Sequence, residues 1–411
     1  MAADALRPTS PAGRWLAIVG VGEDGLAGLG EAAKRAIAGA DVVFGGQRHL
    51  GLVREAIRGE ARPWPVPFDT QAVTALAGRS ICVVASGDPF LHGVGATLAR
   101  SVPAAEMQVF PAPSAFSIAA ARLGWPLAAI ETVSLHGKAI DLIRPLLHPG
   151  RRVITLTSDR HGPGAIATLL TAAGLGSSAM TVMEALGGPN ERLRSTSARH
   201  FDLVDVNDLN VVAIEVEADA GARILPCAAG LPDDMFEHDG QITKREIRAL
   251  VLSSLAPRRG ELLWDVGAGA GSVAIEWMLA DASLRAVAIE SDAERVARIR
   301  RNASACGVPG LDVIEGAAPL AFAGLSAPDA VFVGGGGSDK GVLDGALDAL
   351  KPGGRLVANA VTLEMEAVLL ARHAALGGEL VRLSVARAAP VGTMTGWRPA
   401  MPVTQWVWMK A

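Results

Sequence analysis

The stretch LLWDVGAGAGSVAIEWMLA, residues 262–280, decides the fold of the second half of the chain. Its apolar start predicts a buried strand, its alternating glycines predict a tight turn, and Ser272–Ala280 has the pattern of a helix. Strand, glycine turn and helix together are typical of a nucleotide site, because glycine lets the backbone approach a ligand and the first helical N–H groups have no partner within the helix. The glycine pattern alone is also compatible with a simple turn.

Acidic residues around this turn favour S-adenosylmethionine over a dinucleotide. Asp265 stands two residues before the first glycine, where its carboxylate would repel a pyrophosphate, whereas S-adenosylmethionine has no phosphate and carries two cationic groups. Ser272 occupies the position where the dinucleotide pattern requires a third glycine. The next predicted strand ends in Glu290, where an acid can accept both ribose hydroxyls. An exposed acid at a strand end is the simpler reading of Glu290 taken alone.

The first half repeats this arrangement with different residues. Leu16–Gly22 predicts a strand that runs into a glycine turn, and the following Glu23 makes a phosphate ligand unfavourable there. A further strand ends before Asp88, which is either a ligand contact or a turn residue preceding proline. Ser114 precedes an apolar helical pattern and is predicted to cap that helix.

Short β-branched runs alternate with alanine-rich helical patterns along the whole chain, which predicts an α/β protein with parallel sheets. We expect a domain over residues 14–220, with lobes at about 14–112 and 113–220, and a second domain over 241–411. Between them, residues 221–240 contain proline, glycine and acidic residues, and we interpret them as a linker that contributes little to a core.

Composition excludes several classes of protein. With 411 residues and a formal charge of −4, and with Lys and Arg scattered along the chain, the sequence does not favour a nucleic-acid partner. No apolar stretch reaches the ~18 residues of a membrane span, and residues 1–14 lack the apolar core of a secretory signal, so we expect a cytoplasmic protein. The three cysteines form no CxxC or Cys/His cluster, and we expect neither a disulfide framework nor a metal site.

Motifs along the chain resemble two known families. Residues 15–217 resemble the tetrapyrrole methylases through GVGEDG at 20–25, SGDPF at 86–90 and PAPSAFSIAAARLGWP at 111–126. Within that family, GGQRHL at 45–50 and VSLHGK at 133–138 are similar to the branch that methylates C5 of a corrin precursor.

Residues 238–409 resemble the companion C15 methyltransferases through DGQITKREIRAL, DVGAGAG, EGAAP and FVGGGGS. The order of the two halves is similar to that of the fused precorrin-6B C5,15-methyltransferases (decarboxylating) of aerobic cobalamin biosynthesis.

The resemblance implies a two-lobed tetrapyrrole-methylase fold followed by a Rossmann-like class I methyltransferase fold, each with its own S-adenosylmethionine site. It further implies methylation of precorrin-6B at C5 by the first half, and methylation at C15 with loss of the C12 acetate carboxylate by the second half, giving precorrin-8. Contacts with the methyl donor, carried over residue by residue, fall on Gly22, Asp88, Leu91, Ser114, Leu186, Thr243, Gly267, Ala268, Gly269, Ala270, Gly271, Glu290 and Ala318. We also expect Asp265, from its place before the glycine turn, to contact the donor.

The polycarboxylate tetrapyrrole substrate needs local cations, and the candidates are Arg48, His49, His136, Lys138, Arg387 and Arg398. The sequence departs from the family at Glu23, where many relatives have proline, and at Lys138, where they often have arginine. No residue is assigned to proton transfer, no membrane partner is expected, and a homo-oligomer is expected.

Alternatives remain open at this stage. An NAD(P)-linked oxidoreductase and a methyltransferase acting on another tetrapyrrole are the nearest. A nucleic-acid methyltransferase is disfavoured by the absence of an Asn-Pro-Pro-aromatic motif, and an inactive cofactor-sensing module is disfavoured by two intact glycine turns.

Overall fold

The computed structural model describes residues 13–411, so residues 1–12, part of the segment expected to lack a secretory signal, lie outside the described residues. The chain forms two compact units. One takes in the residues up to Ile140 together with His148–Arg223, and the other takes in Asp141–Leu147 and Ile224–Ala411. No helix within the described part of the chain is both long and apolar enough to cross a membrane.

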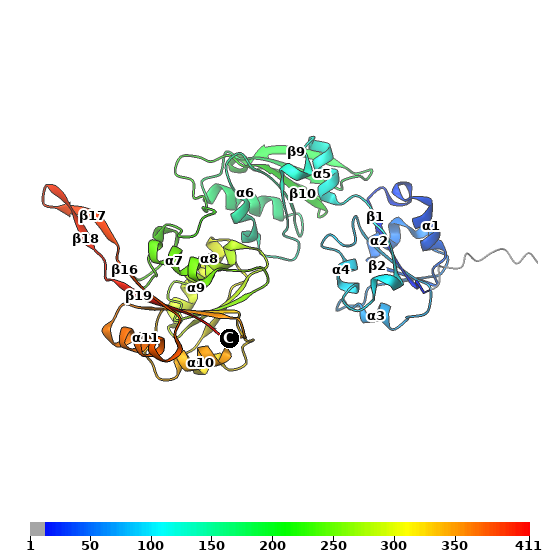
Figure 1. Ribbon diagram of the computed structural model, residues 1–411. Helices are drawn as coiled ribbons and strands as arrows, with labels where there is room; N and C mark the ends of the chain where they lie inside the picture. Colours follow the sequence, from blue (N-terminus) through cyan, green and yellow to red (C-terminus); the bar gives the residue numbers. More distant parts are fainter. Residues whose placement is uncertain (1–12) are drawn as a thin grey trace, which may run out of the picture. The chain divides into compact units, whose positions relative to one another are not determined.

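The first sheet of the first unit is entirely parallel, as expected (Figure 1), with the order β3-β2-β4-β1-β5. Its strands are β1 (Leu16–Val21), β2 (Val42–Gly45), β3 (Glu60–Pro63), β4 (Ile81–Ser86) and β5 (Met107–Phe110), and its helices are α1 (Glu31–Ala38), α2 (Gln47–Leu52), α3 (Gln71–Thr74) and α4 (Val94–Leu98). Alternate side chains of β1 enter different cores: Ile18 packs on the face that holds Phe44, and Val19 packs on the face that holds Ile37 of α1. Both faces are therefore buried, as parallel sheets require.

The second sheet of this unit corrects the expectation of parallel sheets throughout. It has the order β6-β7-β10-β8-β9, and only β6 and β7 pair in parallel. Its elements are β6 (Glu131–Ser134), β7 (Arg152–Leu156), β8 (Ala179–Glu184), β9 (Arg192–Ser197) and β10 (Asn210–Glu215), with helices α5 (Ala115–Leu123) and α6 (Gly162–Ala172). A short loop joins β8 to β9, and such a connection permits only antiparallel pairing because a parallel pair needs a long crossover.

The second unit contains a seven-stranded sheet with the order β13-β12-β11-β14-β15-β19-β16. The strands are β11 (Leu262–Val266), β12 (Arg285–Glu290), β13 (Asp312–Glu315), β14 (Ala330–Val333), β15 (Arg355–Ala360), β16 (Glu379–Leu383) and β19 (Val403–Met409). The first five strands in this order are parallel, and β19 runs antiparallel to both of its neighbours. The strand order reverses beside β11, and ligands of open α/β sheets bind at such switch points.

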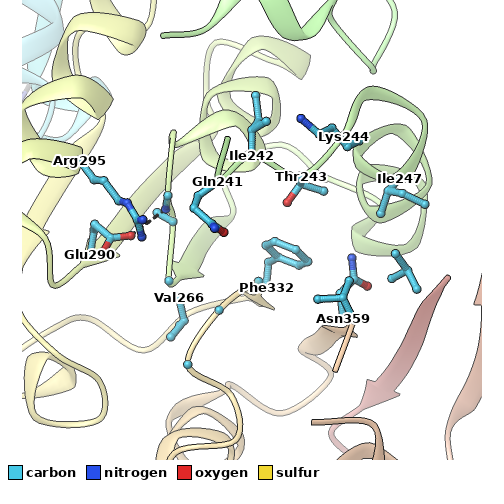
Figure 2. A pocket seen from close by; sticks show the side chains of 18 of the residues that line it. Gln241, Ile242, Thr243, Lys244, Ile247, Val266, Glu290, Arg295, Phe332 and Asn359 are labelled. Atoms are coloured by element: carbon cyan, nitrogen blue, oxygen red, sulfur yellow. Dashed lines mark hydrogen bonds between the residues drawn. The ribbon is translucent and has the colours of Figure 1, made fainter. Parts of the chain in front are cut away.

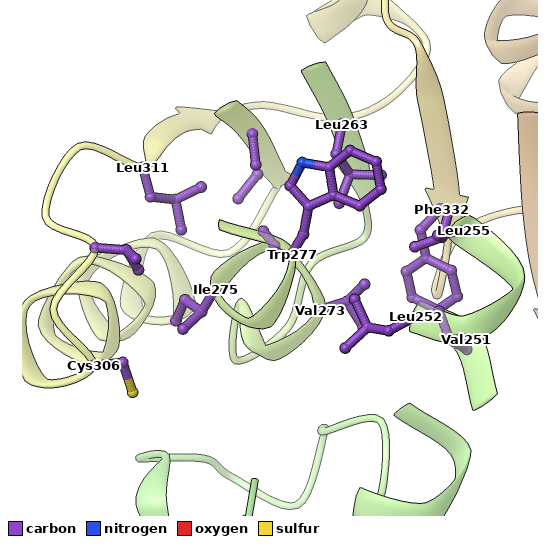
Figure 3. Packing of buried hydrophobic residues seen from close by; sticks show 14 of the residues in the cluster. Val251, Leu252, Leu255, Leu263, Val273, Ile275, Trp277, Cys306, Leu311 and Phe332 are labelled. Carbon is purple, nitrogen blue, oxygen red and sulfur yellow. The ribbon is translucent and has the colours of Figure 1, made fainter. Parts of the chain in front are cut away.

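Helices cover both faces of this sheet, with α7 (Arg245–Leu255), α8 (Ser272–Ala280) and α9 (Ala293–Ala305) on one face and α10 (Val342–Ala349) and α11 (Leu363–Leu376) on the other (Figure 1). Neighbouring residues of β11 alternate between the two cores. Leu263 packs with Trp277 of α8 and Phe332 of β14 (Figure 3), whereas Trp264 faces the α10 side. The apolar run that predicted a buried strand is thus explained by burial on both faces.

A two-stranded hairpin, β17 (Ala386–Val391) and β18 (Met394–Pro399), stands out from the end of the large sheet (Figure 1). Its apolar side chains are exposed, including Met394 and Trp397. No sequence pattern predicted it.

The expectation that residues 221–240 contribute little to a core is wrong. Leu225, Leu231 and Phe236 are buried in the core of the second unit. The backbone N–H of Leu231 also donates to the buried carboxylate of Glu276, at 2.9 Å. The apolar residues stand singly among polar ones, so composition averaged over the segment did not reveal them.

Candidate functional site

A cavity of about 570 Å³ lies in the second unit at the carboxyl ends of its parallel strands. Its walls come from the loops that follow β11, β12, β13 and β14, from the end of β15, and from residues 240–247 before and within α7. This is the switch point of the sheet, so strand order alone directs these loops to one place.

The glycine loop after β11 forms the floor of the cavity. Gly267 has φ +67°, and a Cβ there would lie 2.5 Å from the carbonyl oxygen of Gly335. Gly269 has φ +59°, and a Cβ there would lie 3.0 Å from the carbonyl oxygen of Gln241. Both positions therefore exclude side chains and leave the backbone open to a ligand.

The loop residues predicted to touch the donor separate into two groups. Gly267, Ala268 and Gly269 line the cavity. Ala270 and Gly271 do not, since Ala270 is buried and a Cβ on Gly271 would meet the side chain of Ile299 at 2.7 Å. These two residues turn the chain into α8.

Glu290 ends β12 and presents a fixed carboxylate to the cavity. Its Oε2 accepts the N–H of Gly269 at 2.8 Å, and its Oε1 accepts the N–H groups of Ser291 and Asp292 at 3.0 and 3.1 Å. A carboxylate has about four acceptor positions and three are used here, so about one remains for a ligand hydroxyl. Figure 2 shows Glu290 beside Arg295, whose own partner is Asp239.

Asp265, predicted as a donor contact, is not among the cavity-lining residues and is fully buried beneath the loop. Its Oδ2 accepts the N–H of Ala274 in the first turn of α8, at 3.0 Å. Burial raises the pKa of Asp265 to about 7; the charge of Glu290 adds to this rise and the Ala274 hydrogen bond opposes it. Asp265 therefore ties the glycine loop to α8 and acts on the cavity through the backbone.

Two further predicted residues, Thr243 and Ala318, also line the cavity. Phe332 and Asn359 line it as well, and Figure 2 shows them with Thr243. Sequence reasoning missed Phe332, Asn359 and Arg295. The first two follow the rule that strand ends at the switch point supply ligand contacts, so strand prediction offered a signal for them. Arg295 lies inside α9 and no motif marked it.

Thr243 is held in place by a buried ion pair. Arg248 of α7 donates to the carbonyl oxygens of Thr243 and Leu231, and its Nε lies 2.5 Å from Oε1 of Glu276 in α8. The segment before α7 is thereby fixed against α8.

Two cations were predicted to hold the substrate in this unit. Arg387 lines the cavity and forms an ion pair with Glu246. Arg398 does not line the cavity, but stands directly opposite Arg387 in the register of β17 and β18. Residues paired in this way present their side chains on the same face of the hairpin.

In the first unit, the carboxyl ends of β1, β4 and β5 bring several predicted residues to one edge. The N–H of Gly87 donates to the carbonyl of Val21 at 3.1 Å, and the N–H of Ala112 donates to the carbonyl of Gly87 at 3.2 Å. The loops that carry Gly22, Asp88 and Ser114 therefore start from adjoining strand ends.

The individual residues at this edge differ in what they do. Asp88 Oδ1 accepts the N–H of Phe90 at 2.9 Å, which is the turn contact weighed as the alternative to ligand binding. Ser114 caps α5, as expected, by accepting the N–H of Ser117 at 3.1 Å. Leu91 is exposed, and Leu186 is buried against α5.

Arg48 and His49, at the start of α2, join Ser86 at the end of β4. His49 Nε2 lies 2.6 Å from Ser86 Oγ, and Arg48 Nη2 lies 2.9 Å from the same oxygen. Arg48 also forms an ion pair with Glu23, the residue at which the sequence departs from the family. Burial lowers the pKa of the Arg48 guanidinium. The contacts of Ser86 and Glu23 with Arg48 were not predicted from the sequence, because no local pattern reveals such long-range partners.

His136 and Lys138 are exposed in the loop after β6, which belongs to the second sheet of the unit. Neither has a contact that assigns it a role. Within residues 13–411, no group of three or more His, Cys, Asp and Glu side chains is arranged to hold a metal ion.

Comparison with known proteins assigns both halves. Residues 16–202 match the model of the tetrapyrrole (corrin/porphyrin) methylases, and residues 234–410 match a precorrin methyltransferase domain. A precorrin-6Y C(5,15)-methyltransferase (decarboxylating) from a Sinorhizobium species is 60% identical over 398 residues, covering 96% of each chain. The chain belongs to this family.

The family membership confirms the resemblance stated from the motifs, the α/β class and the two-part fold. The protein is a methyltransferase, S-adenosylmethionine is the methyl donor that its family implies, and its substrate is a precorrin tetrapyrrole. The oxidoreductase alternative is thereby set aside.

Two further relatives cover part of the chain. A cobalt-precorrin-6B C(15)-methyltransferase (decarboxylating) from Salmonella typhimurium is 38% identical over 181 residues, 42% of this chain and 92% of its own. The crystal structure of the C-terminal domain of a Rhodobacter capsulatus precorrin-6Y C5,15-methyltransferase is 48% identical and covers 45% of this chain and 100% of its own, with a TM-score of 0.43.

Proposed function

We propose that the chain binds two molecules of S-adenosylmethionine, one in each unit, and methylates precorrin-6B (precorrin-6Y) at C5 and C15 with loss of the C12 acetate carboxylate, giving precorrin-8. The first unit methylates C5, and the second methylates C15 and releases CO2. The cavity of the second unit carries this proposal: a side-chain-free glycine loop faces a fixed carboxylate at a switch point. This combination suits a nucleoside ligand without phosphate.

In the second unit, Glu290 binds the ribose hydroxyls while the backbone at Gly267 and Gly269 lies against the nucleoside. The bound donor supplies an electrophilic methyl group on a sulfonium. Residues of the cavity exclude water and orient the acceptor carbon, and orientation of this kind contributes up to ~7–11 kcal/mol in ideal intramolecular models.

Support for the division of labour comes from the two separate family matches and from the Salmonella relative, whose name specifies C15 and decarboxylation and which covers 42% of this chain. The conjugated macrocycle can accept the electron pair released with CO2, so the proposed decarboxylation requires no metal. Treatment with EDTA should accordingly leave the reaction rate unchanged.

The hairpin supplies cations for the carboxylates of the acceptor. Like charges placed directly opposite each other destabilise a strand pair, and Arg387, which lines the cavity, stands opposite Arg398 in the hairpin. The ion pair of Arg387 with Glu246 offsets only part of this repulsion. An acceptor carboxylate between them relieves this repulsion and forms charge-assisted hydrogen bonds. Substituting both by Gln should raise KM for the tetrapyrrole in C15 methylation and leave donor affinity unchanged.

Paired variants test the assignment of each methyl group. Glu290→Lys places a cation where the ribose hydroxyls need acceptors, and the loss of charge-assisted bonds worth about 1.5–3 kcal/mol each should abolish C15 methylation. Asp88→Ala should leave a decarboxylated, C15-methylated ring without its C5 methyl group. NMR of product made with labelled methyl donor reads both positions, and Glu294→Lys and Asp202→Ala, at exposed acids, are the controls.

Loss of both methyl groups from either folded variant would contradict the division of labour. Calorimetry with S-adenosylhomocysteine should count two sites per chain in the unsubstituted protein and one in Glu290→Lys. A single site in the unsubstituted protein would contradict the assignment of a donor site to the first unit. Sedimentation velocity tests the expected homo-oligomer.

A further inference from the structure

The Arg48–His49–Ser86 cluster lies at the edge of the first sheet where the loops after β1, β2 and β4 meet. Ser86 is the last residue of β4 and is exposed, while His49 is half-buried behind it. The Ser86 Oγ is 2.6 Å from His49 Nε2 and 2.9 Å from Arg48 Nη2, and the two basic side chains are 2.8 Å apart. Ligands of parallel sheets bind at this edge.

Hydrogen-bond chemistry decides where the protons of the cluster lie. A guanidinium only donates, so the His49 Nε2 that faces Arg48 must be an acceptor, and the ring proton is on Nδ1. The Ser86 hydroxyl shares this acceptor with Arg48 by donating its proton to Nε2, while its own oxygen accepts from Arg48. One lone pair of the Ser86 oxygen is left for a third group on the exposed side.

The same environment keeps His49 neutral. Burial, and next the charge of Arg48, lower the pKa of His49 to about 4. The remaining charged group at the cluster is Glu23, which is paired with Arg48. At neutral pH the cluster thus holds an unprotonated imidazole behind an exposed hydroxyl.

We propose that Ser86 and His49 form the proton acceptor for methylation at C5, with Arg48 as a positioning residue. The proposal rests on the assignment of C5 methylation to the first unit. Attack of the =CH– carbon on the donor methyl forms a C–C bond, breaks the S–C bond and leaves the ring positively charged. The same carbon still carries its hydrogen, and the ring recovers its conjugation only when that hydrogen leaves as a proton.

The cluster completes this step without a further reactant. Ser86 Oγ takes the proton from carbon while its own proton passes to His49 Nε2, and the C–H electron pair returns to the ring. A weak base suffices, because a C–H bond next to a cationic conjugated system is acidic. The adjacent Arg48 then favours release of the proton from the imidazolium to water, which restores the neutral ring.

The alternative is that the cluster only ties three loops together. His49→Gln and Ser86→Ala in the full chain separate the two readings, because Gln keeps a polar group but takes no proton, and Ala breaks the relay. His200→Gln is the matched control, since His200 is exposed and makes a similar contact with Ser197 at 2.9 Å in the second sheet.

We expect both variants to slow C5 methylation by about 10²- to 10⁴-fold in kcat, the usual range for loss of a general base, with little change in KM. C15 methylation and decarboxylation should be unchanged, as should the count of S-adenosylhomocysteine sites. With substrate deuterated at its meso carbons, the isotope effect on C5 methylation should increase in the variants because proton loss becomes rate-limiting. Added imidazole should partly rescue His49→Gly.

A readout independent of turnover is the ¹⁵N spectrum of the histidine rings, which should show His49 as the neutral Nδ1–H form at pH 7. An imidazolium signal for His49 at pH 7 would overturn the relay. So would C5 methylation within threefold of the unsubstituted rate in His49→Gln, or a loss confined to KM or donor affinity. If calorimetry counts a single S-adenosylhomocysteine site in the unsubstituted protein, the proposed function of the first unit fails; if it counts two sites and His49→Gln keeps C5 methylation, only the relay fails.

Discussion

Replacing Glu276 by Gln should destabilise the second unit far more than an ordinary surface substitution. Glu276 is buried in α8, and its two oxygens accept three donors: Arg248 Nε at 2.5 Å and the backbone N–H groups of Leu231 at 2.9 Å and Gly230 at 2.6 Å. An amide accepts at one end only. Its NH2 group must therefore face either a backbone N–H or the guanidinium.

The magnitude follows from the burial of the pair. Glu276→Gln removes the main charged partner of Arg248, whose side chain is fully buried. Removing one partner of a buried ion pair costs about 3–5 kcal/mol. Asp233, 3.2 Å from Arg248, offsets part of this cost. We expect a loss of about 3 kcal/mol in the free energy of unfolding, and about a tenfold loss of donor affinity in the cavity because Arg248 also holds the Thr243 carbonyl.

Native-state hydrogen exchange of the α7 and α8 peptides reads this loss locally, and calorimetry with S-adenosylhomocysteine reads the effect on the cavity. Glu294→Gln, at an exposed position of α9, is the control. The double variant Arg248→Met/Glu276→Leu should lose less stability than the sum of its two single variants, since it leaves no fully buried charge without a partner. A change below about 1 kcal/mol in Glu276→Gln would refute the reasoning.

Three further predictions concern single contacts. Asp265→Asn should remove a loss of folding stability that the buried carboxyl causes at high pH. With a pKa of about 7, the folded carboxyl binds more protons than the unfolded one from about pH 4 to 7. The free energy of unfolding therefore falls as pH rises through that window, by up to about 4 kcal/mol. Urea unfolding at pH 4.5 and 8 should show Asp265→Asn more stable than the unsubstituted protein only at pH 8, and equal curves at both pH values would contradict this. Gly267→Ala should weaken S-adenosylhomocysteine binding to the second unit at least tenfold. The new Cβ would lie 2.5 Å from the Gly335 carbonyl oxygen, and the backbone has a positive φ at this position. Unchanged affinity in calorimetry would argue that the glycine loop need not be free of side chains. Ser114→Ala removes the acceptor for the Ser117 N–H and should cost about 1 kcal/mol of stability in thermal or urea unfolding, whereas an unchanged midpoint would mean that the cap contributes nothing.

Local patterns in the sequence determined much of this protein. The run before Gly267 predicted β11 because both faces of that strand are buried, and Glu290 was placed correctly at the end of β12 because strand length and turn position are short-range properties. Ser114 was recognised as a cap for the same reason, since its acceptor role depends on a residue three positions away. The family resemblance rested on motifs of this local kind.

Tertiary structure alone decided which of these residues meet. Asp265 has a donor-like position in the sequence, but strand alternation turns its carboxylate beneath the loop to α8. Leu231 and Phe236 stand in a segment with the composition of a linker, and yet they are buried because α7 and α8 provide a surface to cover. His49 and Ser86 are 37 positions apart and come within hydrogen-bond distance only because β2 and β4 pair in parallel and end at the same edge. A pattern of neighbouring residues records propensity and alternation, whereas such contacts depend on strand order and register, which are set by packing of the whole sheet.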